Sequence, residues 1–307
     1  MRKIGFIINI HAKKARKNPA LIQKLIESFP DQQSIWTPRT LQELFAVTKK
    51  ILDDRYEVIF LSGGDGTFRA TVESFVNHQS TQPLPYFVLL QGGTGGLYSK
   101  HYYGVQNPLV HLQTTLKKLE SAVTLQGTAL NILNVNGKYG FIFAVGGLSN
   151  LLAYYMSHAE RSIALANWLI FRLILSFIFR TPFYRKISPQ FTVQLQKDAG
   201  PLETIEVTTI SCSSLSVGYI LSPFYNIELN KSFSGLIFNK SPFHVFSHFF
   251  SILGKKQINS THMKNFSAKE IKIFLQQPLQ HMIDGDMLEP AKEIHVSVGP
   301  QLMLLNL

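Results

Sequence analysis

The segment at residues 61–67, Leu-Ser-Gly-Gly-Asp-Gly-Thr, constrains the fold of this chain more than any other stretch. Residues 58–61 are branched or aromatic without alternation, which predicts a buried strand. Apolar residues from Phe68 to Val76 then recur at helical spacing. Three glycines let the backbone turn sharply from strand to helix, and the amides of such a turn favour an anion. We therefore expect a phosphate-binding turn.

The carboxylate of Asp65 in this turn would repel a bound phosphate. A divalent cation removes the conflict, as does a role for Asp65 in accepting the proton of an attacking hydroxyl group. A tight turn with a solvated aspartate is the other interpretation. Gly-Gly-Asp-Gly-Thr directly after a strand is more specific than an isolated glycine-rich turn, so we favour the phosphate site.

The pentad at residues 63–67 resembles the nucleotide-binding signature of diacylglycerol kinases, sphingosine kinases and related bacterial lipid kinases. NAD kinases and phosphofructokinases carry closely similar motifs. The resemblance implies a nucleotide-dependent kinase, but the pentad alone does not name its substrate.

Composition is consistent with a folded intracellular protein. At 307 residues the chain can form one large domain or two of ordinary size, and 45% hydrophobic with 16% charged residues excludes a disordered chain. The single cysteine, Cys212, excludes an internal disulfide and fits a reducing compartment. The apolar run at residues 4–8 is too short for a secretory signal. We interpret it as the first strand and expect a cytoplasmic protein.

The formal net charge of +11 favours an anionic partner. Nucleic acid, an anionic membrane surface and a polyphosphate ligand all fit. The sequence has no zinc-ligand spacing, no RNP-like aromatic motif and no clear helix-turn-helix, so we expect no nucleic-acid partner. A generally basic, soluble surface is the alternative.

Residues 1–121 alternate predicted strands and helices. Asn18 and Pro19 form a good helix start, and Thr40-x-x-Glu43 is a capping box that opens the next helix. The β-α-β-α-β order predicts a Rossmann-like parallel sheet with helices on both faces. Ligands of such sheets bind beyond the carboxyl ends of the strands, where the pentad lies.

Two further loops match the lipid-kinase pattern in part. Asn9 and the basic residues after it stand where these kinases have a loop that approaches nucleotide phosphates; here the loop supplies charge to ATP or is merely solvated. Gly93 and Thr94 match a second loop, and the resemblance implies that they contact the nucleotide. Gly96 and Leu97 replace the asparagine and aspartate that usually follow near the nucleotide and metal.

From about residue 122 the pattern changes to short strands. An Asn-Gly turn at residues 136–137 joins two of them into a hairpin. Further strands are expected at residues 191–196, 203–211, 271–275, 281–283, 287–288, 294–298 and 302–305. This mostly antiparallel pattern predicts a β-sandwich domain over residues 122–307. The resemblance to lipid kinases implies that this domain binds the lipid. An α/β domain over residues 1–121 followed by a β-sandwich is also what the resemblance implies.

The Asp-Gly-Asp sequence at residues 284–286 distinguishes the lipid kinases from the NAD kinases. It resembles the Asp-Gly-Glu of diacylglycerol and sphingosine kinases, with Asp286 one methylene shorter. The resemblance implies that Asp286 assists magnesium or the attacking hydroxyl group. An ordinary Asp-Gly hairpin turn is the alternative.

A structural magnesium site of the family is expected to be absent. Family members carry an aspartate after a Ser-Pro or Ala-Pro segment, where it holds the ion. Ser222 and Pro223 are present, but the following stretch at residues 230–236 begins with Asn230 and has no acid.

Residues 151–186 form an apolar helical segment. Residues 163–179 carry one charge, Arg172, and are slightly short for a membrane span; a charge near the middle is costly in lipid. A buried core helix is one interpretation. The other is a helix that packs partly on the core and presents an apolar, basic-rimmed surface to lipid, giving peripheral membrane association.

We therefore expect a lipid kinase that moves the γ-phosphoryl group of ATP, with Mg²⁺, to the hydroxyl group of a diacylglycerol- or sphingoid-type membrane lipid. Asp65 and Asp286 are the expected catalytic and metal-binding residues. The expected nucleotide-binding residues are Asn9, Gly63, Gly64, Gly66, Thr67, Gly93 and Thr94. A catalytically inactive relative that binds lipid or nucleotide, and an NAD-kinase-like enzyme with a soluble substrate, are the alternatives.

Overall fold

The chain folds into two compact units, one formed by residues 1–130 with 300–307 and the other by residues 131–299. The computed structural model describes residues 2–78, 83–92, 97–158, 162–179, 181–215, 232–239, 258–260 and 262–306. The predicted division gave all of residues 122–307 to a second domain, whereas residues 122–130 and Pro300–Leu307 belong with the first unit.

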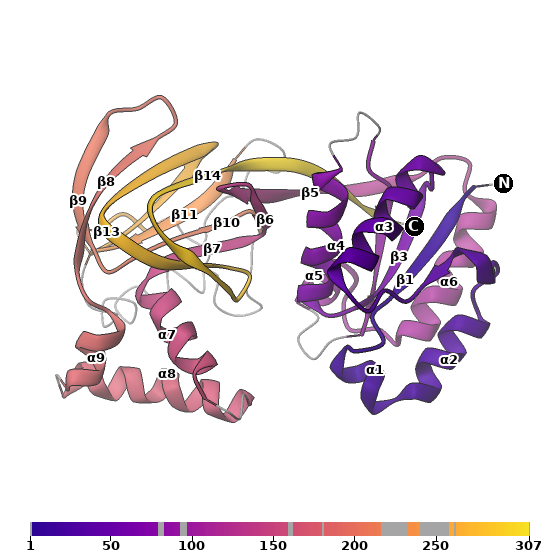
Figure 1. Cartoon of the computed structure of the whole chain (residues 1–307), viewed down its shortest axis with the longest axis horizontal. Coiled ribbons are helices and arrows are strands. Elements are labelled where there is room, and N and C mark those ends of the chain that lie inside the picture. The colour runs from indigo at the N-terminus through magenta and orange to yellow at the C-terminus, as the bar shows by residue number, and fades with distance from the viewer. Residues whose placement is uncertain are drawn as a thin grey trace. The chain divides into compact units, whose positions relative to one another are not determined.

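The first unit is built on a parallel sheet (Figure 1). Its strands are β1 (Ile4–Ile8), β2 (Ile35–Trp36), β3 (Val58–Gly63), β4 (Tyr86–Gln91) and the end of β14 (Asp286–Asn306). They lie in the order β14-β4-β3-β1-β2 with parallel pairings, which confirms the predicted α/β class. The pairing of Met303 with Tyr86 was not predicted, and it adds a strand from beyond the second unit to this sheet.

Helices cover both faces of the parallel sheet. They are α1 (Lys13–Lys17), α2 (Pro19–Glu27), α3 (Leu41–Asp53), α4 (Asp65–Asn77), α5 (Leu97–Tyr103) and α6 (Pro108–Ser121), with a 3₁₀ turn at Gln32–Ser34. Alternate strand residues such as Phe6 and Phe60 join a core with α2 and α6. Phe87 points the other way, where its ring meets Phe68 and Phe75 of α4.

Local capping determines where two of these helices begin, as the sequence predicts. The side chain of Asn18 accepts a hydrogen bond from Leu21 N at 3.1 Å, with Pro19 in the first turn of α2. The hydroxyl group of Thr40 accepts one from Glu43 N at 3.1 Å at the start of α3. The Glu43 carboxylate in turn accepts from Arg39 N, one residue before the position that a standard capping box uses.

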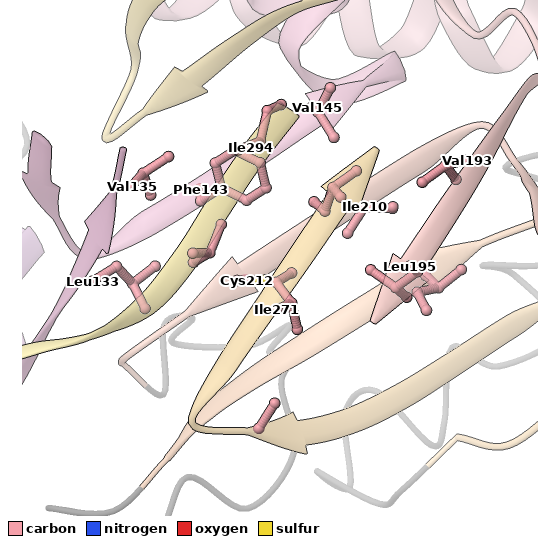
Figure 2. Packing of buried hydrophobic residues seen from close by; sticks show 14 of the residues in the cluster. Leu133, Val135, Phe143, Val145, Val193, Leu195, Ile210, Cys212, Ile271 and Ile294 are labelled. Carbon is pink, nitrogen blue, oxygen red and sulfur yellow. The ribbon is translucent and has the colours of Figure 1, made fainter. Parts of the chain in front are cut away.

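The second unit is mostly antiparallel, which confirms that part of the fold prediction. Its strands are the end of β5 (Gln126–Val135), β6 (Lys138–Gly140), β7 (Ile142–Gly146), β8 (Phe191–Lys197), β9 (Leu202–Val207), β10 (Thr209–Ser213), β11 (Phe233–Phe238), β12 (Met263–Ala268), β13 (Glu270–Ile283) and the first part of β14. The order is β12-β11-β10-β7-β13, and β13 also pairs with β8, which pairs with β9. Their inward side chains form one apolar core (Figure 2).

Strand β13 belongs to both layers of this sandwich. Its residues 271–275 pair with β8, and its residues 281–283 pair with β7. The register shifts between Phe274 and Leu279, a stretch that contains Pro278, which has no N–H group to donate. Irregularities of this kind let a strand turn a corner between sheets.

Three sets of predicted strand boundaries after residue 190 are wrong. The separate strands predicted at 271–275 and 281–283 are one strand, β13. Residues 203–211 form two strands, β9 and β10, separated at Thr208, because β9 pairs with β8 while β10 pairs with β7 and β11. The separate strands predicted at 287–288, 294–298 and 302–305 are one continuous strand, β14. Strands β11 and β12 were not predicted.

Three helices follow β7 in the second unit: α7 (Gly147–Met156), α8 (Ile163–Ile178) and α9 (Pro182–Ile187). Figure 1 shows them together on one side of this unit's strands. Helix α8 contacts both α7 and α9, as expected for a segment that packs partly on the protein. Within the part of the chain that the structure describes, no helix has the length and apolarity needed to cross a membrane.

Candidate active site

The glycine-rich turn joins β3 to the first turn of α4. Gly64 is the N-cap residue and offers no side chain to the helix, and Asp65 is the first helical residue. The first amides of a helix have no helical carbonyl to bond, so those of Asp65, Gly66 and Thr67 point out of the helix end. Together with the helix dipole they favour an anion there. The site begins with this turn.

Close backbone packing explains two of the glycines. A Cβ atom at Gly63 would lie 2.6 Å from Cβ of Thr67, and one at Gly92 would lie 2.7 Å from the backbone N of Gly63. Gly92 N donates to Gly63 O at 3.0 Å, which joins the ends of β3 and β4. Gly66 differs, because a Cβ atom there would meet nothing within 4 Å. Gly66 therefore borders open space.

Asn9 lies beside the glycine-rich turn. Its Nδ2 donates to Oγ1 of Thr67 at 2.8 Å, and its backbone N donates to Ser62 O at 2.9 Å. Its Oδ1 accepts from His11 N at 2.9 Å, which orients the loop after β1. The structure thus brings Asn9 together with residues 63–67, while its nucleotide-binding role stays a prediction. The basic residues Lys13–Lys17 form the short helix α1 instead of the predicted loop.

The carboxylate of Asp65 is half-buried at the start of α4. Its Oδ1 lies 3.4 Å from the backbone N of Tyr98 in α5, a long hydrogen bond that positions the carboxylate only loosely. A carboxylate held this way at a turn whose amides favour an anion can bind a cation or accept a proton.

A pocket of about 370 Å³ opens next to the turn, within the first unit. Its lining includes Asn9, Gly66 and Thr67, together with Arg39 and Arg69, which we did not predict. The full lining is Ile7, Asn9, His11, Pro38, Arg39, Thr40, Leu41, Leu44, Gly66, Thr67, Arg69 and Ala70. Its volume lies in the usual range for small-molecule sites.

The two arginines come to this pocket from different elements. Arg39 follows β2, and its backbone N donates to the Glu43 carboxylate at 2.7 Å. Arg69 is in the second turn of α4, and its guanidinium group lies 3.2 Å from the carboxylate of Glu73. Because β1, β2 and β3 are parallel neighbours, the segments after their carboxyl ends converge at one edge of the sheet. That convergence was the signal that could have identified Arg39.

Asp286 is in the second unit, at an Asp-Gly hairpin turn between β13 and β14. Asp284 and Gly285 have φ of 49° and 92°, and Asp286 pairs with Ile283 as the first, exposed residue of β14. The carboxylate of Asp284 accepts hydrogen bonds from Phe141 N and Ile142 N, at 3.0 and 2.8 Å. Asp284 is therefore structural, while the catalytic role of Asp286 stays a prediction.

The predicted nucleotide-binding residues Gly93 and Thr94 fall outside the described residues, as does Gly96. The segment with Ser222, Pro223 and Asn230, where we expected no structural metal, also falls outside them. Among the residues that are described, no three His, Cys, Asp or Glu side chains gather into a metal-binding cluster. Magnesium in nucleotide-dependent enzymes often takes only one or two carboxylates and otherwise phosphate and water oxygens, so the single carboxylate of Asp65 at this turn fits such an ion.

Three solved structures resemble this chain along almost its whole length. A diacylglycerol kinase from Bacillus anthracis str. Sterne aligns with a TM-score of 0.67 at 15% sequence identity, covering 99% of this chain and 97% of the other. Two structures from the same strain, each named a "putative diacylglycerol kinase", have TM-scores of 0.70 and 0.68 at 16% and 17% identity, with the same coverage. No family model and no curated protein matches the sequence. The predicted resemblance is confirmed at the level of the fold.

Proposed function

We propose that this protein is a lipid kinase, which transfers the γ-phosphoryl group of ATP to the hydroxyl group of a diacylglycerol- or sphingoid-type lipid. The observation that carries the proposal is the pocket of about 370 Å³ that Asn9, Gly66 and Thr67 share with Arg39 and Arg69. It combines amides at a helix N-terminus, two guanidinium groups and the carboxyl edge of a parallel sheet, a combination that suits a nucleoside polyphosphate.

The nucleotide phosphates would lie against the amides of residues 64–67, with Arg39 and Arg69 neutralising part of their charge. Asn9 would hold Thr67, and through it the first turn of α4, in position. Such a site works by positioning and charge neutralisation, because phosphoryl transfer requires little covalent chemistry from the protein.

Asp65 would orient the lipid hydroxyl group and accept its proton, directly or through water. The bond between the γ-phosphorus and the bridging β–γ oxygen breaks, and a bond forms between that phosphorus and the lipid oxygen. ADP leaves with the electron pair of the broken bond, and the hydroxyl proton goes to Asp65. Magnesium, where bound, supplies charge neutralisation of the phosphate oxygens. Asp65 would hold it, while the predicted metal-binding role of Asp286, in the second unit, stays a separate prediction.

A radiolabel experiment tests the proposal. Transfer of labelled γ-phosphate from ATP to a mixed, detergent-dispersed lipid extract is measured with the wild type and with Asp65→Asn, in magnesium and in manganese. We expect a labelled lipid only with the wild type, and its identity names the acceptor. Retained activity in Asp65→Asn would remove Asp65 from the mechanism, and no labelled lipid with either metal would contradict a lipid kinase.

A non-catalytic relative that binds lipid or nucleotide is the second candidate. It is favoured by Gly96 and Leu97, which stand where lipid kinases have an asparagine and an aspartate. Thermal unfolding with and without Mg-ATP separates the possibilities further, because a ligand that binds the folded state raises the melting temperature. A raised melting temperature without any phosphoryl transfer would favour the non-catalytic candidate.

A further inference from the structure

The outward face of α8 in the second unit carries a stripe of large apolar side chains. Trp168, Phe171 and Ile178 are 53%, 51% and 52% exposed, and Leu175 between them is half-buried. Spacings of three and four residues place these side chains along one face of the helix. The rings of Trp168 and Phe171 lie 6.0 Å apart, so they form one continuous surface.

The opposite face of α8 is already packed against the protein. Leu169 and Ser176 are buried, and Oγ of Ser176 accepts a hydrogen bond from Tyr184 N of α9 at 2.7 Å. The guanidinium group of Arg172 lies 4.3 Å from the ring centroid of Phe183 in α9. These contacts fix the rotation of α8 and leave the apolar stripe directed outward.

Basic side chains accompany the stripe. Residues 162–190 contain no aspartate or glutamate and four cations, namely Arg172, Arg180, Arg185 and Lys186. Of these, Arg172, Arg185 and Lys186 are described, and all three are exposed. A second copy of the chain bound face to face would bring like charges together, whereas an anionic lipid surface complements them. Contiguous exposed apolar surface of this kind marks an interaction site.

We propose that the apolar stripe of α8, formed by Trp168, Phe171, Leu175 and Ile178, inserts into the surface of an anionic membrane. The exposed side chains of Arg185 and Lys186 in α9 then face the lipid headgroups. The packed inner face keeps α8 parallel to the membrane surface, as in other interfacial helices. The inference goes beyond the proposed transfer reaction, because it assigns a binding surface and requires no catalysis.

Sedimentation with lipid vesicles tests the proposal. The double variant Trp168→Glu with Phe171→Glu is compared with the wild type on phosphatidylcholine vesicles, with and without phosphatidylglycerol. The matched control, Val123→Glu with Leu202→Glu, adds the same charges at exposed apolar residues that are not part of α8. We expect the α8 variant to bind anionic vesicles at least about tenfold more weakly and the control to bind like the wild type. Equal binding by all three proteins would overturn the proposal.

Tryptophan fluorescence then locates the contact. With a quencher attached to the lipid chains, the wild type should lose intensity on binding. Trp168→Phe keeps the apolar stripe, so it should bind equally well while that loss of intensity disappears. Binding with unchanged quenching in Trp168→Phe would place the contact elsewhere and overturn the proposal.

Two further measurements separate this surface from its alternatives. Arg185→Gln with Lys186→Gln should weaken binding to anionic vesicles more than to neutral ones, and added salt should do the same. Sedimentation velocity without lipid detects a dimer; a wild-type dimer that Trp168→Glu with Phe171→Glu dissociates would assign the stripe to a second copy instead. Phosphoryl transfer to detergent-dispersed lipid is also measured with the double variant Trp168→Glu and Phe171→Glu, because this assay requires no vesicle. Wild-type transfer together with weak vesicle binding would show that docking has failed while the kinase is intact.

Discussion

The side-chain amide of Asn9 donates a hydrogen bond of 2.8 Å to the hydroxyl group of Thr67, which lies 58 positions further along the chain. Asn9 follows β1 and Thr67 lies in the first turn of α4, so this bond joins two loops at one edge of the sheet. The proposed phosphate site depends on the joint position of these loops.

Asn9→Ala and Thr67→Val should each cost about 1 kcal/mol of stability, because each leaves one hydrogen-bonding group without its partner. The double variant should cost less than the sum, since the second change removes a partner that is already lost. Urea unfolding of the four proteins measures this coupling. Strict additivity would contradict a functional hydrogen bond between the two side chains.

Gly63→Ala and Gly66→Ala should affect different properties, stability for Gly63 and ATP binding for Gly66, although both residues lie in the pentad. The new Cβ at Gly63 meets Thr67 at 2.6 Å, so we expect a loss of about 1–3 kcal/mol of stability. The new Cβ at Gly66 meets nothing within 4 Å, so stability should change by less than about 0.5 kcal/mol while ATP binding weakens. Thermal unfolding and calorimetric titration with ATP measure the two effects. Unchanged ATP affinity in Gly66→Ala would argue against phosphates at this turn.

Arg39→Gln and Arg69→Gln should each weaken ATP binding by about tenfold, because each removes a charge-assisted contact to the phosphates. Glu73→Gln is the matched control: it removes the carboxylate next to Arg69, so affinity should be unchanged or higher. Titration calorimetry at two salt concentrations checks both statements, since the arginine variants should also lose part of the salt dependence. Full affinity in the arginine double variant would place the nucleotide elsewhere.

Substitutions of Asp284 and Asp286 should affect different properties, stability for Asp284 and lipid phosphorylation for Asp286. Asp284→Ala leaves the amides of Phe141 and Ile142 without their acceptor and should cost about 2–3 kcal/mol of stability. Asp286→Asn changes an exposed side chain, so stability should stay within about 0.5 kcal/mol while lipid phosphorylation falls. Denaturant unfolding and the radiolabel assay distinguish the two. Wild-type activity in Asp286→Asn would mean that residues 284–286 form only an ordinary hairpin turn.

The protein should lose stability as the pH falls below about 6.5, the usual pKa of histidine. Burial lowers the pKa of His111, and the positive charge of Lys118 lowers it further. Burial also lowers the pKa of His281, and a backbone hydrogen bond with Leu279 partly offsets that decrease. The unfolded chain therefore takes up protons at a pH where the folded protein does not. Each of the two histidines then lowers the free energy of unfolding by about 1.4 kcal/mol per pH unit of acidification.

Replacing either buried histidine with phenylalanine should reduce that pH dependence. His111→Phe tests the first unit and His281→Phe the second, by urea unfolding at several pH values between about 5 and 7.5. Stability that rises on acidification in the wild type would contradict the lowered pKa values.

Local sequence rules predicted the part of the site that is itself local. The strand, the glycine-rich turn and the start of α4 are contiguous, and Asn18 and Thr40 cap their helices through contacts within three residues. Arg39 was missed because it becomes a neighbour of the turn only when β2 pairs with β1, whereas Arg69 follows the pentad by two residues in α4 and could have been identified from the sequence. Sequence periodicity contains no information about which strands are adjacent.

The strands of the second unit were predicted in outline, because their sequence signals are local as well. Alternating apolar residues and the Asn-Gly turn identify antiparallel strands, but not the layer to which each one belongs. Thr208 interrupts a pattern that reads as one strand because its two halves have different partners. Likewise, the apolar composition of α8 does not tell which face is buried; the packing of Leu169 and Ser176 decides that Trp168 and Phe171 face outward.

The final part of β14 affects the order in which this protein can assemble. Met303 and Leu304 complete the parallel sheet of the first unit, yet a ribosome makes them only after all of residues 131–299. Vectorial folding from the N-terminus would therefore leave β4 with an uncovered sheet edge until synthesis has passed the second unit. During synthesis the edge of β4 therefore stays open to pairing with other chains. The sheet of the first unit is completed only after residues 131–299, the second unit, have been made.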